Sequence, residues 1–206
     1  MSKQEFKKCV EFHGHACPGI AIGYRAAQIL MGRLGVRKAP DEELVAVVET
    51  DACGSDAIQV MTGCTFGKGN FIFKNYGKHA FSLSDRKQGR TVRVCFCSES
   101  LKPNPEHRSL MERVRSGQAT QEETGRYRRL QQDRIEAILT ADAGELFTVE
   151  EASAVIPPEA KVVESVACDF CRELTRIDLL REVDGGKACI PCAQDIRCQD
   201  LGRGLT

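Results

Sequence analysis

The sequence predicts an α+β protein in which helices pack on a mixed or antiparallel sheet. Three observations lead to this fold class. Helix signals and β-rich runs follow one another up to about residue 101, in the order α-α-β-α-β-β-β. Two charged amphipathic helices come next, after a break at Pro103-Asn104-Pro105. Two Cys-x2-Cys pairs then mark a small separate module near the end of the chain.

The first two elements are predicted to be helices. Ser2 and Glu5 have the spacing of a capping box, and Gly14 breaks the helix that they start. Pro18 suits the first turn of a second helix, which is expected to stop near Gly35. Each helix has one apolar face, formed by Phe6, Cys9, Val10 and His13 in the first and by Ile22, Ala26, Ile29 and Leu30 in the second.

The middle of the chain is predicted to supply the sheet. β-branched and aromatic residues gather there in short runs that turn residues separate. A short helix interrupts these runs, from Gly54 or Ser55 to Thr62. The polar turn at residues 85–89 is expected to join the last two strands as a hairpin. The predicted strands are Leu44 to Thr50, Phe71 to Tyr76, His79 to Ser84 and Arg90 to Cys97.

The segment after the proline break is predicted to be mainly helical. Its two helices are expected over Glu106 to Ser116 and Gln121 to Thr140, and a further strand over Phe147 to Val149. Pro157-Pro158 marks the boundary to the cysteine module. We therefore divide the chain into an α+β core (1–102), a helical segment that completes the core or links it onward (103–160), and a cysteine module (161–206).

Composition and charge exclude several classes of function. The 206 residues include 29 basic and 29 acidic side chains, a balance that gives no electrostatic reason to expect a nucleic-acid partner. No apolar run approaches the roughly 18 residues of a membrane span, and the first residues lack the apolar core of a secretion signal. A cytoplasmic location is therefore expected. In that compartment the eleven cysteines predict reduced thiols and metal sites rather than disulfides.

The paired cysteines predict a structural zinc site. The pairs are separated by 17 residues, a spacing typical of four-cysteine zinc fingers. A turn at residues 184–186 would return the second pair to the first, and a short helix is expected to begin over residues 192–196, as in a zinc ribbon or treble clef. Four thiolates fill a tetrahedral ion, so this zinc should be structural, and acidic neighbours favour a protein partner. The predicted ligands are Cys168, Cys171, Cys189 and Cys192.

A second chemical cluster lies at the junction of the first two helices. His13, His15 and Cys17 fall within five residues, and Cys17 directly precedes Pro18 at a helix start. Free amides and the helix dipole stabilise a thiolate at such a position. His15 could bind the same metal ion or act as the base of Cys17, which makes these two the candidate catalytic residues. The alternative is a capped helix start with two surface histidines.

Two further blocks follow the first predicted strand. Residues 51–59 place Cys53 at the carboxyl end of that strand and near a helix start. Residues 62–70 form a glycine-rich turn, but Gly63 and Lys68 do not fit the spacing of a Walker phosphate loop. Anion binding by the amides of this turn and by Lys68 stays open. Four other cysteines are left without an assigned role: Cys9, Cys95, Cys97 and Cys198.

Taken together, three blocks resemble the signature of the FmdE family, which is named for the E component of the molybdenum formylmethanofuran dehydrogenase. They are His13 to Gly19, Asp51 to Gln59 and Thr62 to Asn70. The C-terminal cysteines resemble those of the longer, finger-bearing members. The resemblance implies an α+β core that is usually dimeric, with a metal-binding cleft, while the redox chemistry of the dehydrogenase belongs to its other components.

The resemblance also implies which residues form the core metal site. His15 and Cys17 are the site residues of the first block, and Cys53 and Cys64 are the candidates from the later blocks. The ion would be a second zinc or another transition metal, because mixed imidazole and thiolate ligands suit several metals. The sequence identifies neither the metal nor a substrate.

Three functional hypotheses follow. In the first, the chain is a cytoplasmic metal-binding accessory protein of the FmdE type, a homodimer that uses its finger for protein contacts. In the second, it is a stand-alone metalloenzyme with an open metal position at His15 and Cys17, and Asp56 or His13 transfers protons. In the third, it is a structural interaction module whose cysteines only pack. We favour the first.

Overall fold

The computed structural model describes residues 3–99, 101–152, 156–159 and 162–194. The chain divides into two compact units, Met1–Ala160 and Lys161–Thr206. The predicted α+β class is confirmed, because the first unit packs helices on a mixed sheet. The second unit consists of small hairpins around the paired cysteines.

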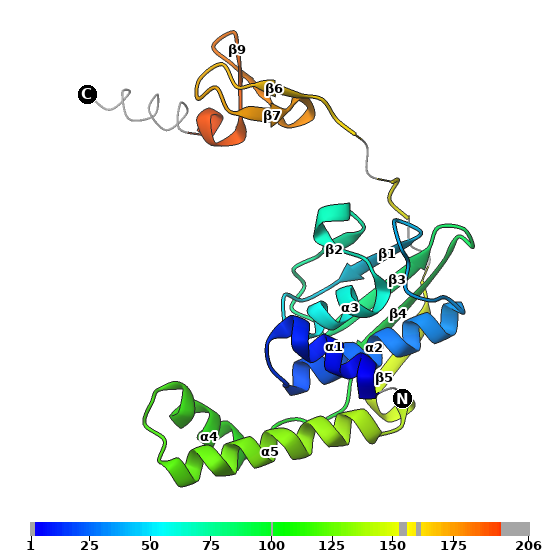
Figure 1. Ribbon diagram of the computed structural model, residues 1–206, viewed down its shortest axis with the longest axis vertical. Helices are drawn as coiled ribbons and strands as arrows, with labels where there is room; N and C mark the ends of the chain where they lie inside the picture. Colours follow the sequence, from blue (N-terminus) through cyan, green and yellow to red (C-terminus); the bar gives the residue numbers. More distant parts are fainter. Residues whose placement is uncertain (1–2, 100, 153–155, 160–161, 195–206) are drawn as a thin grey trace. The chain divides into compact units, whose positions relative to one another are not determined.

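The sheet of the first unit has five strands in the order β2-β1-β3-β4-β5 (Figure 1). β1 and β2 are parallel, and the other neighbours are antiparallel. The predicted hairpin joins β3 to β4, and the strand predicted at 147–149 is β5, which extends the sheet beside β4. The strands are β1 (Leu44–Val48), β2 (Phe71–Phe73), β3 (Ala80–Asp85), β4 (Arg90–Phe96) and β5 (Phe147–Glu151).

β2 is shorter than the predicted run of 71–76. After Phe73 the chain turns around Gly77, whose φ of +65° suits glycine. The amides of Tyr76 and Lys78 both donate to the Glu49 carbonyl, at 3.3 and 3.0 Å, and do not continue the ladder. The β-rich composition of this run therefore overstated the length of the strand.

Three helices pack against one face of the sheet: α1 (Lys3–His13), α2 (Pro18–Leu34) and α3 (Gly54–Thr62). α2 begins where the Cys17 sulfur accepts the Ile20 amide at 3.4 Å, and it ends at Gly35, whose φ is +68°. The predicted ends of these helices agree with the structure. The capping role predicted for Ser2 lies outside the described residues.

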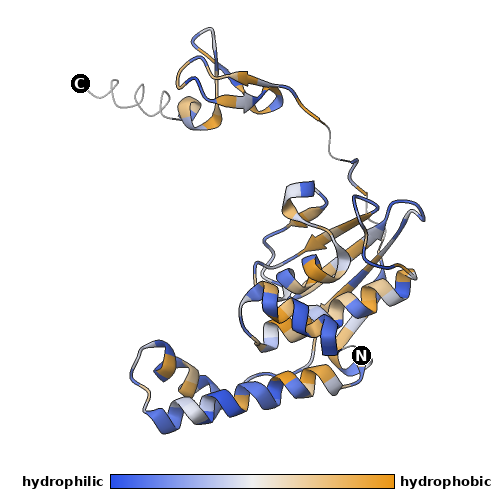
Figure 2. Ribbon diagram, viewed as in Figure 1, coloured by the Kyte–Doolittle hydropathy of each residue, from blue (hydrophilic) through white to orange (hydrophobic). Residues whose placement is uncertain are grey.

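The helical segment forms α4 (Pro105–Arg115), α5 (Gln121–Thr140) and the short α6 (Ala143–Leu146). The sequence pattern did not predict α6, because four residues are too few to show a helical period. α4 packs on α5, and α5 packs on α2. Figure 2 shows that α4 and the first part of α5 are mostly hydrophilic. Within the described part of the chain, no helix is both long enough and apolar enough to cross a membrane.

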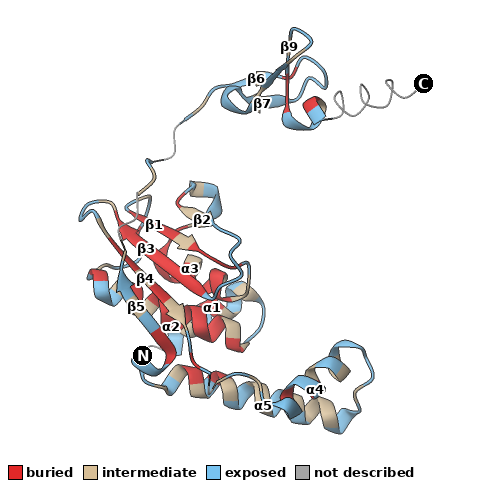
Figure 3. Cartoon of the chain, turned by 180° about the vertical axis from the view of Figure 1, so that it is seen from behind, coloured by how far each residue is buried: buried red, intermediate tan, exposed pale blue. Residues whose placement is uncertain are grey.

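The hydrophobic core lies between the sheet and the helices α1 to α3. Alternate strand residues face the helices, so Ala46 and Val48 are buried there together with Leu83 and Val94. Figure 3, which views the chain from behind, shows the buried sheet and the more exposed α5. The largest fully buried side chains include Tyr24, Phe81, Ile20, Leu30, Ile58 and Leu83.

α2 and α3 meet backbone to backbone through glycines. A Cβ added at Gly23 would lie 2.1 Å from the Gly54 carbonyl oxygen and 2.5 Å from the Gly54 Cα. No side chain fits such a gap, so both helices need glycine here. On its other side, a Cβ added at Gly54 would lie 3.0 Å from the Phe81 ring. This contact therefore fixes α3 between α2 and the sheet.

A buried arginine joins α2 to the end of α5. Its carbonyl partners are the unpaired C-terminal groups of α5, where the helix dipole is negative. Burial lowers the pKa of the Arg25 guanidinium. The Arg25 side chain donates to the carbonyls of Ile138, Leu139 and Ala141, at 3.0, 2.6 and 2.9 Å.

The second unit consists of two hairpins and a helical turn. The predicted turn at 184–186 joins β8 to β9, with Asp184 and Gly185 at φ +49° and +80°. The helix expected from 192 begins earlier, over residues 190–194, and residues 195–196 lie outside the described residues. The elements are β6 (Ser165–Ala167), β7 (Leu174–Arg176), the 3-10 turn η2 (Ile177–Leu179), β8 (Arg181–Val183) and β9 (Gly186–Ala188).

Replacing Gly23 by alanine should destabilise the protein by about 2 kcal/mol or more, because the new methyl group overlaps the Gly54 backbone. Gly32 on the same helix is the matched control, since nothing lies within 4 Å of a Cβ added there. Gly32→Ala should be neutral or stabilise by up to about 1 kcal/mol. Urea denaturation measures both values, and equal effects would contradict the proposed close approach.

A second prediction concerns the salt bridge of Glu49 and Arg93 on the other face of the sheet. Their two hydrogen bonds are 2.6 and 3.0 Å long, and the Glu49 side chain is 9% exposed. The hydrogen bonds from Arg93 lower the pKa of Glu49 below its ordinary value of 4.5. The depressed pKa means that Glu49 stabilises the folded protein above pH 4.5 and loses this effect as the pH falls below that value.

Glu49→Gln should therefore lower the free energy of unfolding by about 1–2 kcal/mol at neutral pH. The difference from the unmodified protein should narrow in acid. Glu151→Gln is the control, because Glu151 pairs with Arg90 at the exposed sheet edge and should contribute less than about 0.5 kcal/mol. Denaturation curves at several pH values measure this, and a difference that grows in acid would contradict the assignment.

Candidate functional site

The core site is built on a tight turn between α1 and α2. α1 ends at His13, and Gly14 follows with φ +91°, a conformation that glycine adopts freely. The Gly14 amide donates to the Val10 carbonyl at 2.8 Å, which closes the last turn of α1. This turn gathers His13, His15 and Cys17, and one possible ligand atom from each lies within 4.8 Å of the others.

A carboxylate from α3 orients His13. Asp56 Oδ2 lies 2.7 Å from His13 Nδ1, and His13 Nε2 lies 3.9 Å from the Cys17 sulfur. We assign the Nδ1 proton to the bond with Asp56, which leaves the Nε2 lone pair facing Cys17. Carboxylates commonly orient metal-binding histidines in this way. The His13 and His15 ring centroids are 4.6 Å apart, so both imidazoles face one space.

His13 was not predicted as a ligand, because the sequence assigned it and Asp56 only to proton transfer. The two residues are separated by 43 positions, so their contact depends on how α1 packs on α3. The available signal was the His-Gly-His spacing of residues 13–15, which a left-handed glycine folds back on itself. The structure therefore brings together His15 and Cys17, as predicted, and adds His13.

Cys53 approaches the cluster from the start of α3. A Cβ added at Gly19 would lie 3.5 Å from the Cys53 sulfur and 3.7 Å from the Cys17 sulfur, so the two thiols flank Gly19. Burial and the neighbouring Cys17 side chain raise the pKa of the Cys53 thiol. Cys53 is thus beside Cys17, next to the three-residue cluster.

Cys64 lies apart from this site. It follows the carboxyl end of α3, and nine helical residues, or about 14 Å, separate it from the end that carries Cys53. Its side chain is fully buried, and burial raises its pKa. The structure therefore does not bring Cys64 to the site that the family resemblance implied, and the side chain packs in the core.

The other core cysteines also lie outside the cluster. Cys9 is fully buried, which raises its pKa to about 11. Cys95 is paired opposite Thr148 in the ladder, and the exposed Cys97 lies near the Leu146 carbonyl. Cys198 lies outside the described residues. A different element, α5, supplies a cation: Cys17 opposes the lowering of the Arg134 pKa that burial causes.

The second cluster consists of the four predicted finger cysteines, whose sulfurs all lie within 4.8 Å of one another. A tetrahedral zinc ion with Zn–S bonds of about 2.3 Å separates its sulfurs by about 3.8 Å. The Cys171 and Cys189 sulfurs are 3.8 Å apart. The donor set and its spacing therefore fit a zinc finger. The four residues are Cys168, Cys171, Cys189 and Cys192.

Backbone amides prepare the finger for a cation. The Cys189 amide donates to the Cys168 sulfur at 3.3 Å. Amide hydrogen bonds from Cys171 and Cys189 lower the pKa of Cys168 to about 6. Crowding against Cys189 raises the pKa of Cys192 to about 12. One thiolate is thus favoured and the others are suppressed by it, an imbalance that a divalent cation relieves.

Comparison with known proteins identifies the family. Residues 12–148 match the family model described as FmdE, molybdenum formylmethanofuran dehydrogenase operon. The match includes the His13, His15 and Cys17 cluster and ends before the finger.

Two known proteins illustrate what this chain is similar to. A probable S-adenosyl-L-methionine-binding protein of Archaeoglobus fulgidus is 31% identical over 204 residues, which cover 95% of this chain and 54% of that protein. This chain therefore spans about half the length of that relative. The crystal structure of an FmdE-like protein of tungsten formylmethanofuran dehydrogenase, from Syntrophus aciditrophicus, superposes with a TM-score of 0.62. It is 24% identical and covers 94% of this chain and 92% of its own.

Proposed function

Because the chain belongs to the FmdE family, we propose that it is a metal-binding accessory protein, related in role to the molybdenum formylmethanofuran dehydrogenase. A metal ion would bind at His13, His15 and Cys17, and a structural zinc would hold the finger. The observation that carries this proposal is the Asp56–His13 contact of 2.7 Å, which directs the second imidazole nitrogen toward Cys17. Nothing in packing alone requires that orientation.

The chemistry of the two donor sets supports different tasks. Four thiolates complete a tetrahedral shell, which suits a structural zinc. Two imidazoles and one thiolate suit zinc and several transition metals. A reducing, cytoplasmic environment suits this protein, because the cysteines of the described residues are all unpaired.

A stand-alone metalloenzyme is the second candidate function. The specific observation in its favour is that the core group offers three ligands, which leaves a fourth position for water or substrate. Cys53 decides between the two functions, because it lies beside Cys17 and could close the shell. X-ray absorption spectroscopy of the core metal would count the sulfur ligands: two sulfurs favour storage or transfer, and one sulfur with a solvent oxygen favours catalysis.

The finger offers a surface for a protein partner. A unit with so little interior leaves many apolar side chains in contact with solvent. Leu174 is 76% exposed. Other exposed apolar residues of the finger are Phe170, Ile177, Leu179 and Ile190.

We do not extend S-adenosyl-L-methionine binding to this chain. The chain spans 54% of the Archaeoglobus protein that carries this name. A pocket between α1 and α3 is lined by Lys8, Lys38 and Lys68. Those ammonium groups would repel the positively charged sulfonium of that ligand.

Removing one ligand from each cluster tests the two-site proposal. Protein purified without added metal should contain about two metal equivalents per chain. Cys17→Ala should retain about one, in the finger, because the core would lose its thiolate. Cys189→Ala is the reciprocal control and should retain about one equivalent in the core. Elemental analysis measures all three proteins.

The outcome that contradicts the proposal is specific. Unmodified protein with a single tightly bound metal that Cys189→Ala removes and Cys17→Ala retains would leave the core cluster without a metal function.

A homodimer is proposed as well, and exposed aromatic residues beside the edge strand β2 support it. Phe73 is 46% exposed and Tyr76 is 59% exposed. Light scattering should give twice the chain mass of 22.7 kDa. Phe73→Lys with Tyr76→Lys should shift the mass toward the monomer, whereas Phe170→Lys in the finger should not. A monomeric unmodified protein at micromolar concentration would refute this proposal.

A further inference from the structure

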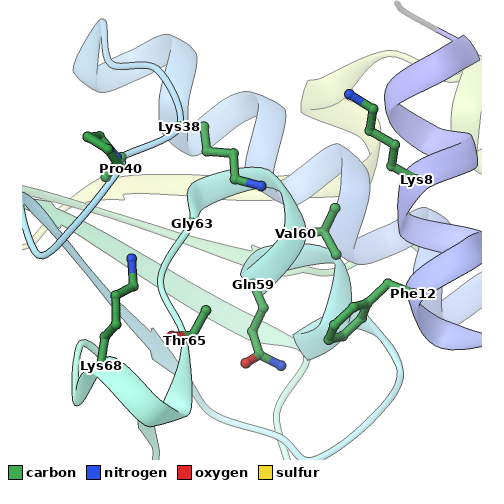
Figure 4. A pocket seen from close by; sticks show the side chains of 10 residues that line it. Lys8, Phe12, Lys38, Pro40, Gln59, Val60, Gly63, Thr65 and Lys68 are labelled. Atoms are coloured by element: carbon green, nitrogen blue, oxygen red, sulfur yellow. The ribbon is translucent and has the colours of Figure 1, made fainter.

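A second concave site of the core unit lies between α1 and α3, on residues other than those of the His13, His15 and Cys17 cluster. Its volume is about 700 Å³, within the range of pockets that hold small organic ligands. α1 forms one wall and α3 another, and the loop of residues 38–40 and the turn of residues 65–68 complete it (Figure 4).

The wall opposite α1 is held by a glycine. Gly63 has φ +80°, and a Cβ added there would lie 2.3 Å from the Ala39 carbonyl oxygen. The Ala39 amide donates to the Thr62 carbonyl at 2.9 Å. The loop that carries Lys38 is therefore fixed against the end of α3, which makes the pocket a preformed feature of the core.

The pocket is positively charged. Figure 4 shows Lys8 on the α1 side and Lys38 and Lys68 on the loop side. Its lining contains no acidic residue. Among the described residues, none of these lysines forms an ion pair, and the Lys68 ammonium group donates to the Asp41 carbonyl at 3.0 Å. Glu5 lines an adjoining pocket, where Arg37 accompanies it.

An apolar platform lies beside these charges. Phe12 is 60% exposed although it is aromatic, and it lies one helical turn from Lys8 on α1. Val60 and Pro40 also line the pocket, and Gln59 and Thr65 supply polar groups. Figure 4 shows the Phe12 ring next to Val60. An exposed ring beside several ammonium groups is suited to a ligand that is planar at one end and anionic at the other.

The backbone of the glycine-rich turn does not supply the anion contacts. The Cys64 amide donates to the Thr62 hydroxyl at 3.2 Å, and the Thr65 amide donates to Asn70 Oδ1 at 2.9 Å. The Gly69 amide donates to the Phe66 carbonyl at 3.1 Å. These amides are therefore already paired, and any anion must be recognised by the lysine side chains.

We propose that this pocket binds an organic diphosphate that carries a planar ring, with the ring against Phe12 and the phosphates among Lys8, Lys38 and Lys68. This site goes beyond the metal-binding function and does not rest on it. Its elements are nevertheless shared with the metal site, since Phe12 directly precedes His13 on α1 and α3 carries both Asp56 and Gln59.

Isothermal titration calorimetry of the full chain with ADP tests the proposal. ADP should bind, inorganic diphosphate should bind more weakly, and adenosine should bind at least about tenfold more weakly than ADP. Lys8→Ala with Lys38→Ala should weaken ADP binding about tenfold or more. The matched control is Lys74→Ala with Lys78→Ala, which removes the same charge from exposed positions outside the pocket and should change affinity less than about twofold.

Phe12→Ala separates the two halves of the ligand, because it should weaken ADP binding and leave diphosphate binding unchanged. Thermal unfolding checks that each variant is folded. Three results would overturn the proposal: no binding of ADP or diphosphate at millimolar concentration, equal losses in the two double variants, or adenosine binding as tightly as ADP. The readout is nucleotide affinity, so a failure here is distinct from a failure of the metal analysis.

Discussion

The core site depends on the glycine contact between α2 and α3. Since the Gly23 and Gly54 backbones touch, the two helices approach closely enough for their amino-terminal ends to lie side by side. Cys17 caps α2 and Cys53 directly precedes α3, so both thiols are at the positive ends of helix dipoles. A larger residue at the contact would separate the helices and move Cys53 away from Cys17. The chemistry of the site is thus a consequence of how the core packs.

The two clusters are built in opposite ways. In the finger, ligands near in sequence meet in tight turns, and the few buried residues described there are Cys168, Ala188, Cys189 and Ala193. So small an interior cannot offset chain entropy without a cross-link, and for reduced thiols a metal ion is the natural one. The core unit buries a full hydrophobic cluster and needs no metal to fold. A metal in the core would therefore be there for function, and a metal in the finger for stability.

The same contrast explains what could be predicted from sequence. Helices α1, α2, α3 and α5 were placed by local signals such as Pro18, Gly35 and the apolar period, and the finger ligands by cysteine spacing. The partners that depend on packing were not predicted. Asp56 reaches His13 from 43 residues away. Cys53 and Cys64 looked equivalent in sequence, yet α3 carries them at opposite ends.

The attachment of α1 links the metal site to the lysine pocket. Among its described residues α1 buries only Cys9, and its end is fixed by the Gly14 turn and by the bond from His13 to Asp56. Phe12 and Lys8 of this lightly anchored helix line the pocket. A ligand that drew α1 toward α3 would alter the separation of His13 and Cys17, now 3.9 Å. Since such coupling is reciprocal, a metal held by His13 would in turn change the affinity of the pocket.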